Sequence, residues 1–289
     1  MWSDDDLAPY LDRLGLPGII DVHVHFMAPA IRDAVWAYFD AAGPKLGRPW
    51  PIQYRTGDEN RVETLRRLGV RSYGALSYAH KPGVAAFMND WCAGFADAHP
   101  ENIRSATFYP EPEAAEYVPA AIAAGARLFK AHLQVGEFAA DDPLLDPVWA
   151  AVETAQIPVV LHAGSGPAPG THTGPGGVAH VLKRYPELPL VIAHLGMPEY
   201  AEFFDLAERY RNVRLDTTMT FVDFWGDPPD VDPDRLLALQ DKIVFGSDFP
   251  NIPYPYAHQV EALDRLGLGD DWMRAVLWQN PEHLVGPPR

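Results

Sequence analysis

The stretch GIIDVHVH, residues 18–25, has the pattern of a short buried strand that ends in a polar pair. Side chains two apart on a strand point the same way, so Asp21, His23 and His25 share one face. Two neutral imidazoles held side by side form a good chelate for zinc, iron, nickel or copper. A His-x-His pair alone does not define a site, and the rest of the chain has to support it.

Seven further apolar segments follow, and they alternate with amphipathic helical segments such as 84–98, 114–124, 145–155 and 199–210. This alternation predicts a parallel α/β fold. Eight repeats without a break in composition favour a (β/α)8 TIM barrel over an open sheet, and barrels of this kind have about 250 residues. We therefore predict one domain over residues 1–289. The eight predicted strands are 18–25, 70–76, 103–109, 127–132, 158–162, 190–194, 213–216 and 243–247.

The connection from Phe26 to about Asn60 departs from the repeat. It predicts a distorted barrel with a long loop after strand 1, placed over the mouth of the barrel.

Composition limits the classes of function. The net charge of −16 disfavours binding to nucleic acid or to an anionic membrane. No run approaches the roughly 20 apolar residues that span a bilayer. The acidic N-terminus lacks the features of a secretory signal, so we expect a cytoplasmic protein. The one cysteine, Cys92, excludes an intramolecular disulfide and a cysteine-based zinc site.

Three more strands end in a polar residue where the chain enters a loop. These residues are His162, His194 and Asp248. In a (β/α)8 barrel such positions surround the C-terminal mouth, where active sites lie. With His23 and His25 they predict a site for one divalent metal ion, zinc first, with manganese, iron or cobalt as alternatives. Asp248 would ligate the metal and accept a proton, and His194 would polarise a carbonyl or donate a proton.

Lys130 and His132 form another same-face pair at the end of strand 4. A lysine inside a barrel is costly unless it is paired or functional. It would bind a substrate carboxylate, pair with an acid, or be carboxylated and bridge a second metal ion. We rank substrate binding ahead of the bridge, and we interpret His132 as a pocket wall or hydrogen-bond donor.

Aromatic residues gather in the predicted mouth loops, among them Trp225 and Tyr254. Together with Arg55 they are candidates for contact with a small-molecule substrate. Aromatic loops of this kind would also suit the interface of a homodimer.

With these residues in place, the sequence resembles the amidohydrolase superfamily. More narrowly, it resembles the amidohydrolase-related group that includes aminocarboxymuconate-semialdehyde decarboxylase and pyrone-dicarboxylate lactonase. The stretches that carry the resemblance are IIDVHVHF at 19–26, LFKAHLQ at 128–134, VVLHAG at 159–164, VIAHLG at 191–196 and FGSDFP at 245–250.

The resemblance implies a role for each matching residue. His23 and His25 would be the metal ligands of strand 1, His162 that of strand 5, and Asp248 the ligand or proton acceptor of strand 8. His194 matches a histidine that is catalytic in mononuclear members and a ligand in binuclear ones. Lys130 falls on the strand that carries a carboxylated lysine in binuclear relatives, although its KAH context is closer to members with one metal ion.

The leading hypothesis is hydrolysis of a small carbonyl compound (a lactone, ester or amide) by metal-activated water. The alternative is metal-dependent, non-oxidative decarboxylation of a small carboxylic acid, for example an aromatic one. Decarboxylation should require a cationic clamp, and no arginine directly follows strands 5 to 8, which favours hydrolysis. A third hypothesis, a non-catalytic metal-binding protein, would not need the acid–base set.

Overall fold

A computed structural model describes residues 2–226 and 229–288 of the protein. Its contacts divide the chain into two compact units. One unit comprises Met1–Tyr73 and Thr217–Arg289, and the other comprises Gly74–Asp216. We call them the outer-segment unit and the middle unit.

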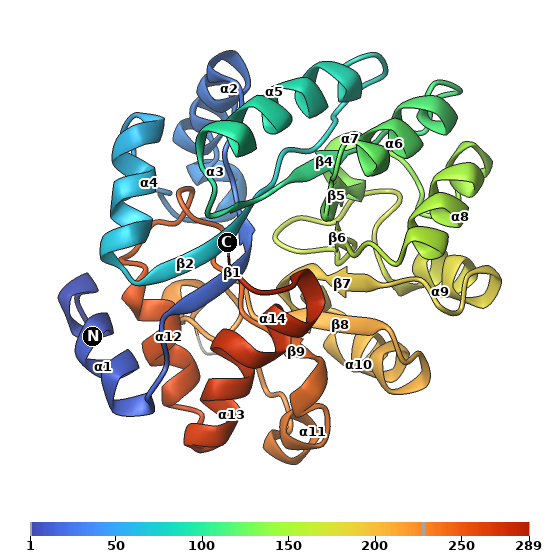
Figure 1. Ribbon diagram of the computed structural model, residues 1–289. Helices are drawn as coiled ribbons and strands as arrows, with labels where there is room; N and C mark the ends of the chain where they lie inside the picture. Colours follow the sequence, from blue (N-terminus) through green and yellow to red (C-terminus); the bar gives the residue numbers. More distant parts are fainter. Residues whose placement is uncertain (1, 227–228, 289) are drawn as a thin grey trace. The chain divides into compact units, whose positions relative to one another are not determined.

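The middle unit is built on parallel strands. From β4 to β8 the strands are neighbours in chain order, and the registers place Lys130 beside Val160 and His132 beside His162 (Figure 1). Nearly all their residues are buried, as expected for a parallel sheet covered on both faces. The strands of this unit are β3 (Asn102–Ile103), β4 (Ser105–Thr107), β5 (Leu128–His132), β6 (Val159–His162), β7 (Leu190–Ile192) and β8 (Val213–Asp216).

From β4 onward, helices lie between successive strands of the middle unit, and the longer ones bury apolar residues. In α8 the fully buried indole of Trp149 packs edge-on against Phe108, with 5.2 Å between the ring centroids. The helical elements are α5 (Ala85–Ala98), α6 (Ala114–Ala123), α7 (Leu133–Gly136), η2 (Pro143–Leu145), α8 (Asp146–Ala155), α9 (Pro175–Arg184), η3 (Ala193–Gly196) and α10 (Tyr200–Arg209).

The outer-segment unit is organised around β1, whose six residues are all buried. Its Val22 N–H donates to the Phe245 carbonyl at 3.1 Å, so the first strand is bonded to the segment just after β9. Its elements are η1 (Asp4–Asp6), α1 (Leu7–Leu14), β1 (Ile19–Val24), α2 (Pro29–Ala41), α3 (Gly43–Leu46), α4 (Asp58–Arg67), β2 (Val70–Ala75, whose last two residues belong to the middle unit), η4 (Asp223–Trp225), α11 (Pro233–Ala238), η5 (Gln240–Lys242), β9 (Ile243–Val244), α12 (Ala257–Asp264), α13 (Asp270–Arg274), the π-helical η6 (Ala275–Gln279) and α14 (Asn280–Val285).

The connection after strand 1 is long, as predicted, but it is not an irregular loop. It forms α2 and α3, since the segment starts with Pro29 at the first turn and continues with good helix formers. Two tryptophans fix it to the loop after β9. The Nε1–H of Trp36 donates to Oδ1 of Asn251 at 3.1 Å, and that of Trp50 donates to the Asn251 carbonyl at 2.6 Å.

The predicted strands agree with the observed ones in order and position, and only three differ by more than one residue at an end. The third divides into β3 and β4, the sixth ends at Ile192 instead of His194, and the eighth ends at Val244 instead of Ser247. In the last two cases the backbone turns before the polar residue is reached. His194 and Asp248 therefore lie in the loops after their strands.

Cys92 is buried in α5, and its sulfur lies 3.8 Å from the Ala75 carbonyl. Burial raises the pKa of the thiol to about 12.

In the part of the chain that the structure describes, no helix is both long and apolar enough to cross a membrane.

Candidate metal centre

The first two candidate ligands lie at the end of β1. His23 is the fifth residue of the strand, and His25 follows its last residue. Both side chains are buried, and their rings meet edge to face with 5.1 Å between centroids. Extended backbone puts residues two apart on the same side, so the predicted pairing of the two imidazoles is found in the structure.

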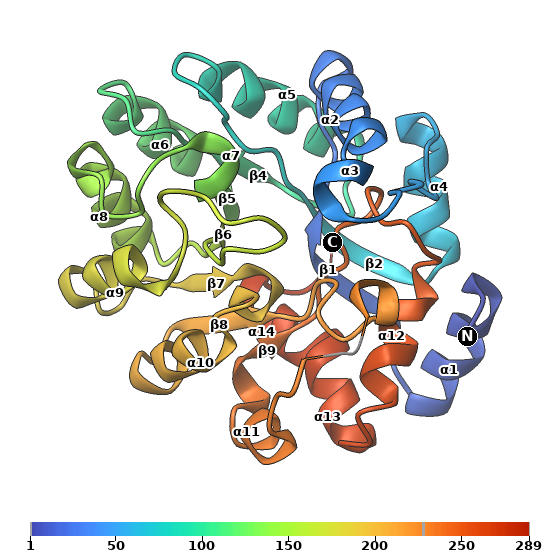
Figure 2. The ribbon, with the colours of Figure 1, turned by 180° about the vertical axis from the view of Figure 1, so that it is seen from behind.

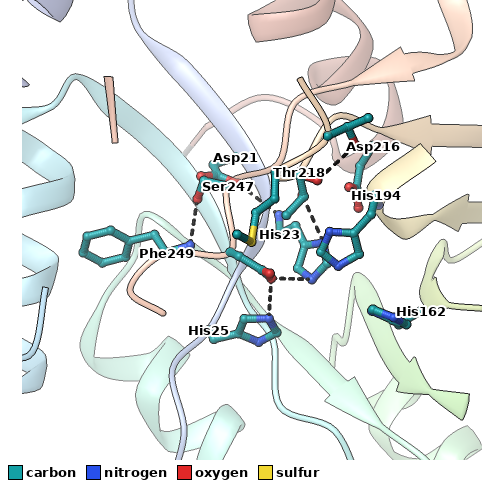
Figure 3. A network of polar contacts seen from close by, with 12 residues as sticks. Asp21, His23, His25, His162, His194, Asp216, Thr218, Ser247 and Phe249 are labelled. Atoms are coloured by element: carbon teal, nitrogen blue, oxygen red, sulfur yellow. Dashed lines mark hydrogen bonds and ion pairs between the residues drawn. The ribbon is translucent and has the colours of Figure 1, made fainter. Parts of the chain in front are cut away.

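Asp248 brings a carboxylate to the same point. Its φ of 63° is in the left-handed region, which few residues other than glycine, asparagine and aspartate adopt. The backbone holds it there, because the Asp248 N–H donates to the His23 carbonyl at 2.9 Å and Asn251 donates to the Asp248 carbonyl at 2.8 Å. Its Oδ1 consequently lies 3.2 Å from Nε2 of His23 and 3.0 Å from Nε2 of His25 (Figure 3).

These three side chains form a donor set that fits a divalent cation. One ligand atom from each of His23, His25 and Asp248 lies within 4.8 Å of the others, and both histidines are buried. Within residues 2–226 and 229–288 it is the one such group of histidine, cysteine and acidic residues. Two imidazole nitrogens and a carboxylate oxygen suit zinc, and also manganese, iron or cobalt.

A buried carboxylate on β1, that of Asp21, bonds the backbone of His23 to the side chain of Tyr256. Asp21 has no solvent exposure, and its Oδ1 accepts the N–H of His23 at 3.1 Å. Its Oδ2 accepts the hydroxyl of Tyr256 at 2.8 Å. Burial and then the charge of Asp21 raise the pKa of Tyr256 well above its ordinary value, so the phenol stays a donor at neutral pH. Asp21 thus fixes the strand that carries the histidines.

We expect Tyr256→Phe to lower the free energy of unfolding by about 1.5–3 kcal/mol, the usual contribution of a hydrogen bond to a charged group. The substitution removes the hydroxyl from Asp21 and leaves the ring in place. Urea unfolding followed by circular dichroism measures the change. Tyr38→Phe, at a half-exposed position, is the control, and its change should stay within about 0.5 kcal/mol. Equal losses in the two variants would contradict the bracing role.

The middle unit aligns three histidines at the ends of adjacent strands. The rings of His132 and His162 are stacked, with 3.9 Å between centroids and 10° between planes. His162 meets His194 edge to face at 4.8 Å. The three imidazoles therefore form one contiguous row.

Hydrogen bonds select the tautomers of two of these rings. Nε2 of His162 lies 2.9 Å from the Gly166 carbonyl. A carbonyl only accepts, so this nitrogen carries the proton, and Nδ1 is the nitrogen with a lone pair for a ligand. Nδ1 of His132 accepts the Val135 N–H at 3.3 Å, which leaves the proton on Nε2 as a donor. Figure 2 shows the connection from β6 to α9, which contains Gly166, at this end of the strands.

His194 lies in an unusual turn. Its φ is 56°, and the left-handed conformation continues through Leu195 and Gly196. The carboxylate of Asp216, at the end of β8, accepts the N–H of His194 at 2.9 Å (Figure 3). This bond holds the backbone in a conformation that costs about 1–3 kcal/mol for an ordinary residue. Such strain is concentrated at functional sites.

The remaining predicted residues have different surroundings. Lys130 is fully buried on β5. Arg55 is exposed and forms a bidentate pair with Asp40, at 2.6 and 2.8 Å. Tyr254 is buried, and burial and then the charges of Asp248 and Asp223 raise its pKa well above the ordinary value. Trp225 lies in η4, and its side chain is outside the described part of the structure.

Sequence reasoning missed the supporting residues. Thr218, whose hydroxyl meets His23, lies in the run LDTTMT, which has no feature that marks one threonine among three. Gln259, in α12, bonds both Met219 and Ser247. Of the supporting residues, only Asp216 could have been identified from the sequence, because it is the polar residue at the end of an apolar strand.

Comparisons with known proteins extend these observations. The sequence matches the amidohydrolase family over residues 20–286, and the chain belongs to this family. Among proteins with curated descriptions, none matches the chain by sequence.

Solved structures resemble the chain over almost its whole length. An uncharacterised TIM-barrel protein from Bordetella bronchiseptica is 23% identical, with a TM-score of 0.75 over 92% of this chain and 98% of that one. A probable 2-pyrone-4,6-dicarboxylic acid hydrolase from Acinetobacter baumannii is 17% identical (TM-score 0.60, 93% and 100% covered). A 5-carboxyvanillate decarboxylase from Novosphingobium aromaticivorans, complexed with manganese and a nitrobenzoic acid, is 14% identical (TM-score 0.64, 93% and 96% covered).

The likenesses show the fold, and they confirm the prediction of a (β/α)8 TIM barrel. Family membership confirms the resemblance to the amidohydrolase superfamily, whose enzymes include both hydrolases and decarboxylases.

Proposed function

We propose that the protein is a metal-dependent hydrolase of a small carbonyl compound such as a lactone, ester or amide. The observation that carries the proposal is the convergence of His23, His25 and Asp248 on one point, in a chain of the amidohydrolase family. These three residues would hold a divalent cation, zinc first and manganese next. A cation held there would lower the pKa of water to about 7 and so supply a nucleophile at neutral pH.

We then assign a role to each candidate residue of the site. Asp248 would accept a proton as water attacks, because its carboxylate oxygen lies 3.2 Å from Nε2 of His23 and 3.0 Å from Nε2 of His25. We assign His162 as a further ligand through Nδ1 and His194 as the donor to the substrate carbonyl oxygen. These two assignments rest on the family resemblance, and the tautomer of His162 is compatible with the first. Lys130, His132, Tyr254 and Trp225 are assigned to substrate binding.

The surroundings of two cationic side chains, Arg55 and Lys81, favour hydrolysis over decarboxylation. A decarboxylase should hold its carboxylate substrate with a cationic clamp. Arg55, one candidate, is exposed and already engages both oxygens of Asp40. Lys81, in the connection after β2, is exposed as well. Arg55 therefore has a smaller part in the proposal than its position in the sequence indicated.

Decarboxylation of a small carboxylic acid is the second candidate function. The likeness of the fold to 5-carboxyvanillate decarboxylases supports it, and Lys130, buried on β5, is the cationic side chain that would meet the substrate carboxylate. In that reaction the cationic side chain orients the carboxylate, and an acid such as His194 protonates the carbon that CO2 leaves.

We expect protein purified without chelators to hold about one equivalent of divalent metal per chain, and its activity to disappear on chelation and return with zinc or manganese. Mass spectrometry of the metals gives the stoichiometry. A panel of lactones, esters and small carboxylic acids, followed both for acid release and for CO2, separates the two reactions. Absence of metal together with failure to take it up would exclude both. A protein that binds metal but turns over nothing in the panel would favour the non-catalytic alternative.

A further inference from the structure

Thr218 touches the candidate metal centre without belonging to its donor set. Its hydroxyl oxygen lies 3.2 Å from Nδ1 of His23, the ring nitrogen opposite the one that faces Asp248 (Figure 3). Both side chains are buried. The imidazole of His23 is therefore held at both nitrogens, by a carboxylate at Nε2 and by a hydroxyl at Nδ1.

A hydroxyl can serve either tautomer of this ring, because it both donates and accepts. When Nε2 carries the proton and donates to Asp248, Nδ1 has a lone pair, and the Thr218 hydroxyl donates to it. When a cation occupies the lone pair of Nε2, the proton must lie on Nδ1, and the Thr218 oxygen accepts it. The ring keeps its orientation in both states, and only the hydroxyl hydrogen turns.

We infer that Thr218 is a positioning residue of the metal centre, one that orients His23 and stabilises the tautomer in which Nε2 binds the cation. The inference rests on the proposed function, since it presupposes that His23 is a ligand. Partners that fix the unbound nitrogen of a ligating histidine typically contribute 10- to 100-fold to metal affinity.

The loop that carries Thr218 is itself fixed to the loop that carries Asp248. The buried carboxamide of Gln259 accepts the Met219 N–H at 2.9 Å and donates to the Ser247 carbonyl at 2.7 Å. Thr220 adds a bond from its hydroxyl to the Thr218 carbonyl at 3.2 Å. One side chain thus bonds the residue after Thr218 to the residue before Asp248, which keeps the two partners of His23 in register.

Thr217 provides a matched control. It is buried like its neighbour, yet its Oγ1 has no hydrogen-bond partner among the described residues. Thr217→Val and Thr218→Val remove the same group from adjacent positions in the same loop. They differ in that the hydroxyl of Thr218 lies at hydrogen-bond distance from His23, whereas that of Thr217 has no hydrogen-bond partner among the described residues.

The test measures zinc binding by the full-length apoprotein, using competition with a chromophoric chelator, for the wild type and for Thr218→Val, Thr218→Ser and Thr217→Val. We expect Thr218→Val to weaken zinc binding about 10- to 100-fold, and the other two variants to stay within about threefold of the wild type. Urea unfolding identifies any variant whose fold has changed.

A spectroscopic measurement distinguishes orientation of the ring from general loosening. In ¹⁵N-histidine-labelled, zinc-loaded protein, with the His23 signal assigned by its loss in His23→Gln, the wild type should show the proton on Nδ1. Thr218→Val should shift or broaden that signal, and Thr218→Ser should restore it. Wild-type affinity in Thr218→Val, or failure of serine to restore the signal, would overturn the inference alone. A wild-type protein that binds no zinc or manganese would overturn the metal centre and the inference with it.

Discussion

Asp248→Asn is expected to lower turnover by about 100- to 10,000-fold, the range that a positioned proton acceptor contributes. Asparagine keeps the size of the side chain and one oxygen, but it loses the negative charge between His23 and His25 and cannot accept a proton. The backbone should tolerate the change, because asparagine adopts the left-handed conformation at φ 63° as readily as aspartate does. The loss is therefore chemical and not structural.

Steady-state kinetics with the best substrate of the panel measure this loss, and urea unfolding verifies the fold. Asp270→Asn removes a carboxylate from an exposed ion pair with Arg13 and should leave the activity within about twofold of the wild type. Full activity in Asp248→Asn would eliminate the proposed site. An equal loss in both variants would point to a general electrostatic effect.

His23→Ala should reduce the metal content of purified protein from about one equivalent to almost none. His23 is one of the three donors, so we expect its removal to weaken binding by more than the roughly 100-fold that loss of an outer partner costs. Turnover should fall in parallel. Mass spectrometry of the metals measures the first quantity, and kinetics at saturating zinc or manganese measure the second.

His180→Ala is the matched control, because it removes an exposed imidazole that also contacts a carboxylate, that of Asp141. Its metal content should equal that of the wild type. If His23→Ala still bound a full equivalent, the ion would have to lie elsewhere, and the assignment of β1 as the ligand strand would be wrong.

The order of strands and helices could be predicted from the sequence because each strand is short, apolar and followed by an amphipathic helix. β8 was predicted with its observed bounds, and α5, α6, α8 and α10 within one residue at each end. These elements depend on local periodicity. The end of β7 was harder to predict, because the left-handed turn at His194 depends on the carboxylate of Asp216, which lies 22 residues further along the chain.

The metal cluster was predictable for a similar reason. The spacing of His23 and His25 is a local feature, and Asp248 directly follows an apolar run. The partners of the cluster were not predictable, because Thr218 is 195 residues from His23 and Tyr256 is 235 residues from Asp21. The choice among several threonines or tyrosines is made by packing at long range, on which a single sequence carries no information.

The helices after strand 1 were missed for a different reason, because here the local sequence did carry the information. The segment 26–60 was predicted as a long loop because it departs from the repeat, and its own helical propensity received too little weight. The run PAIRDAVWAYFDA, which forms the 13 residues of α2, begins with proline, and few of its other residues disfavour a helix. A segment that departs from the repeat of strands and helices keeps its own propensity to form a helix.

The isolation of Cys92 makes the chain convenient for site-specific labelling. The one thiol of the protein is enclosed by α5 and bonded to a backbone carbonyl, and its high pKa leaves it almost entirely in the unreactive protonated form at neutral pH. A cysteine introduced at an exposed position such as Tyr38 or Phe87 would then be the single reactive thiol. Fluorophores or spin labels can be attached there without first replacing a native residue.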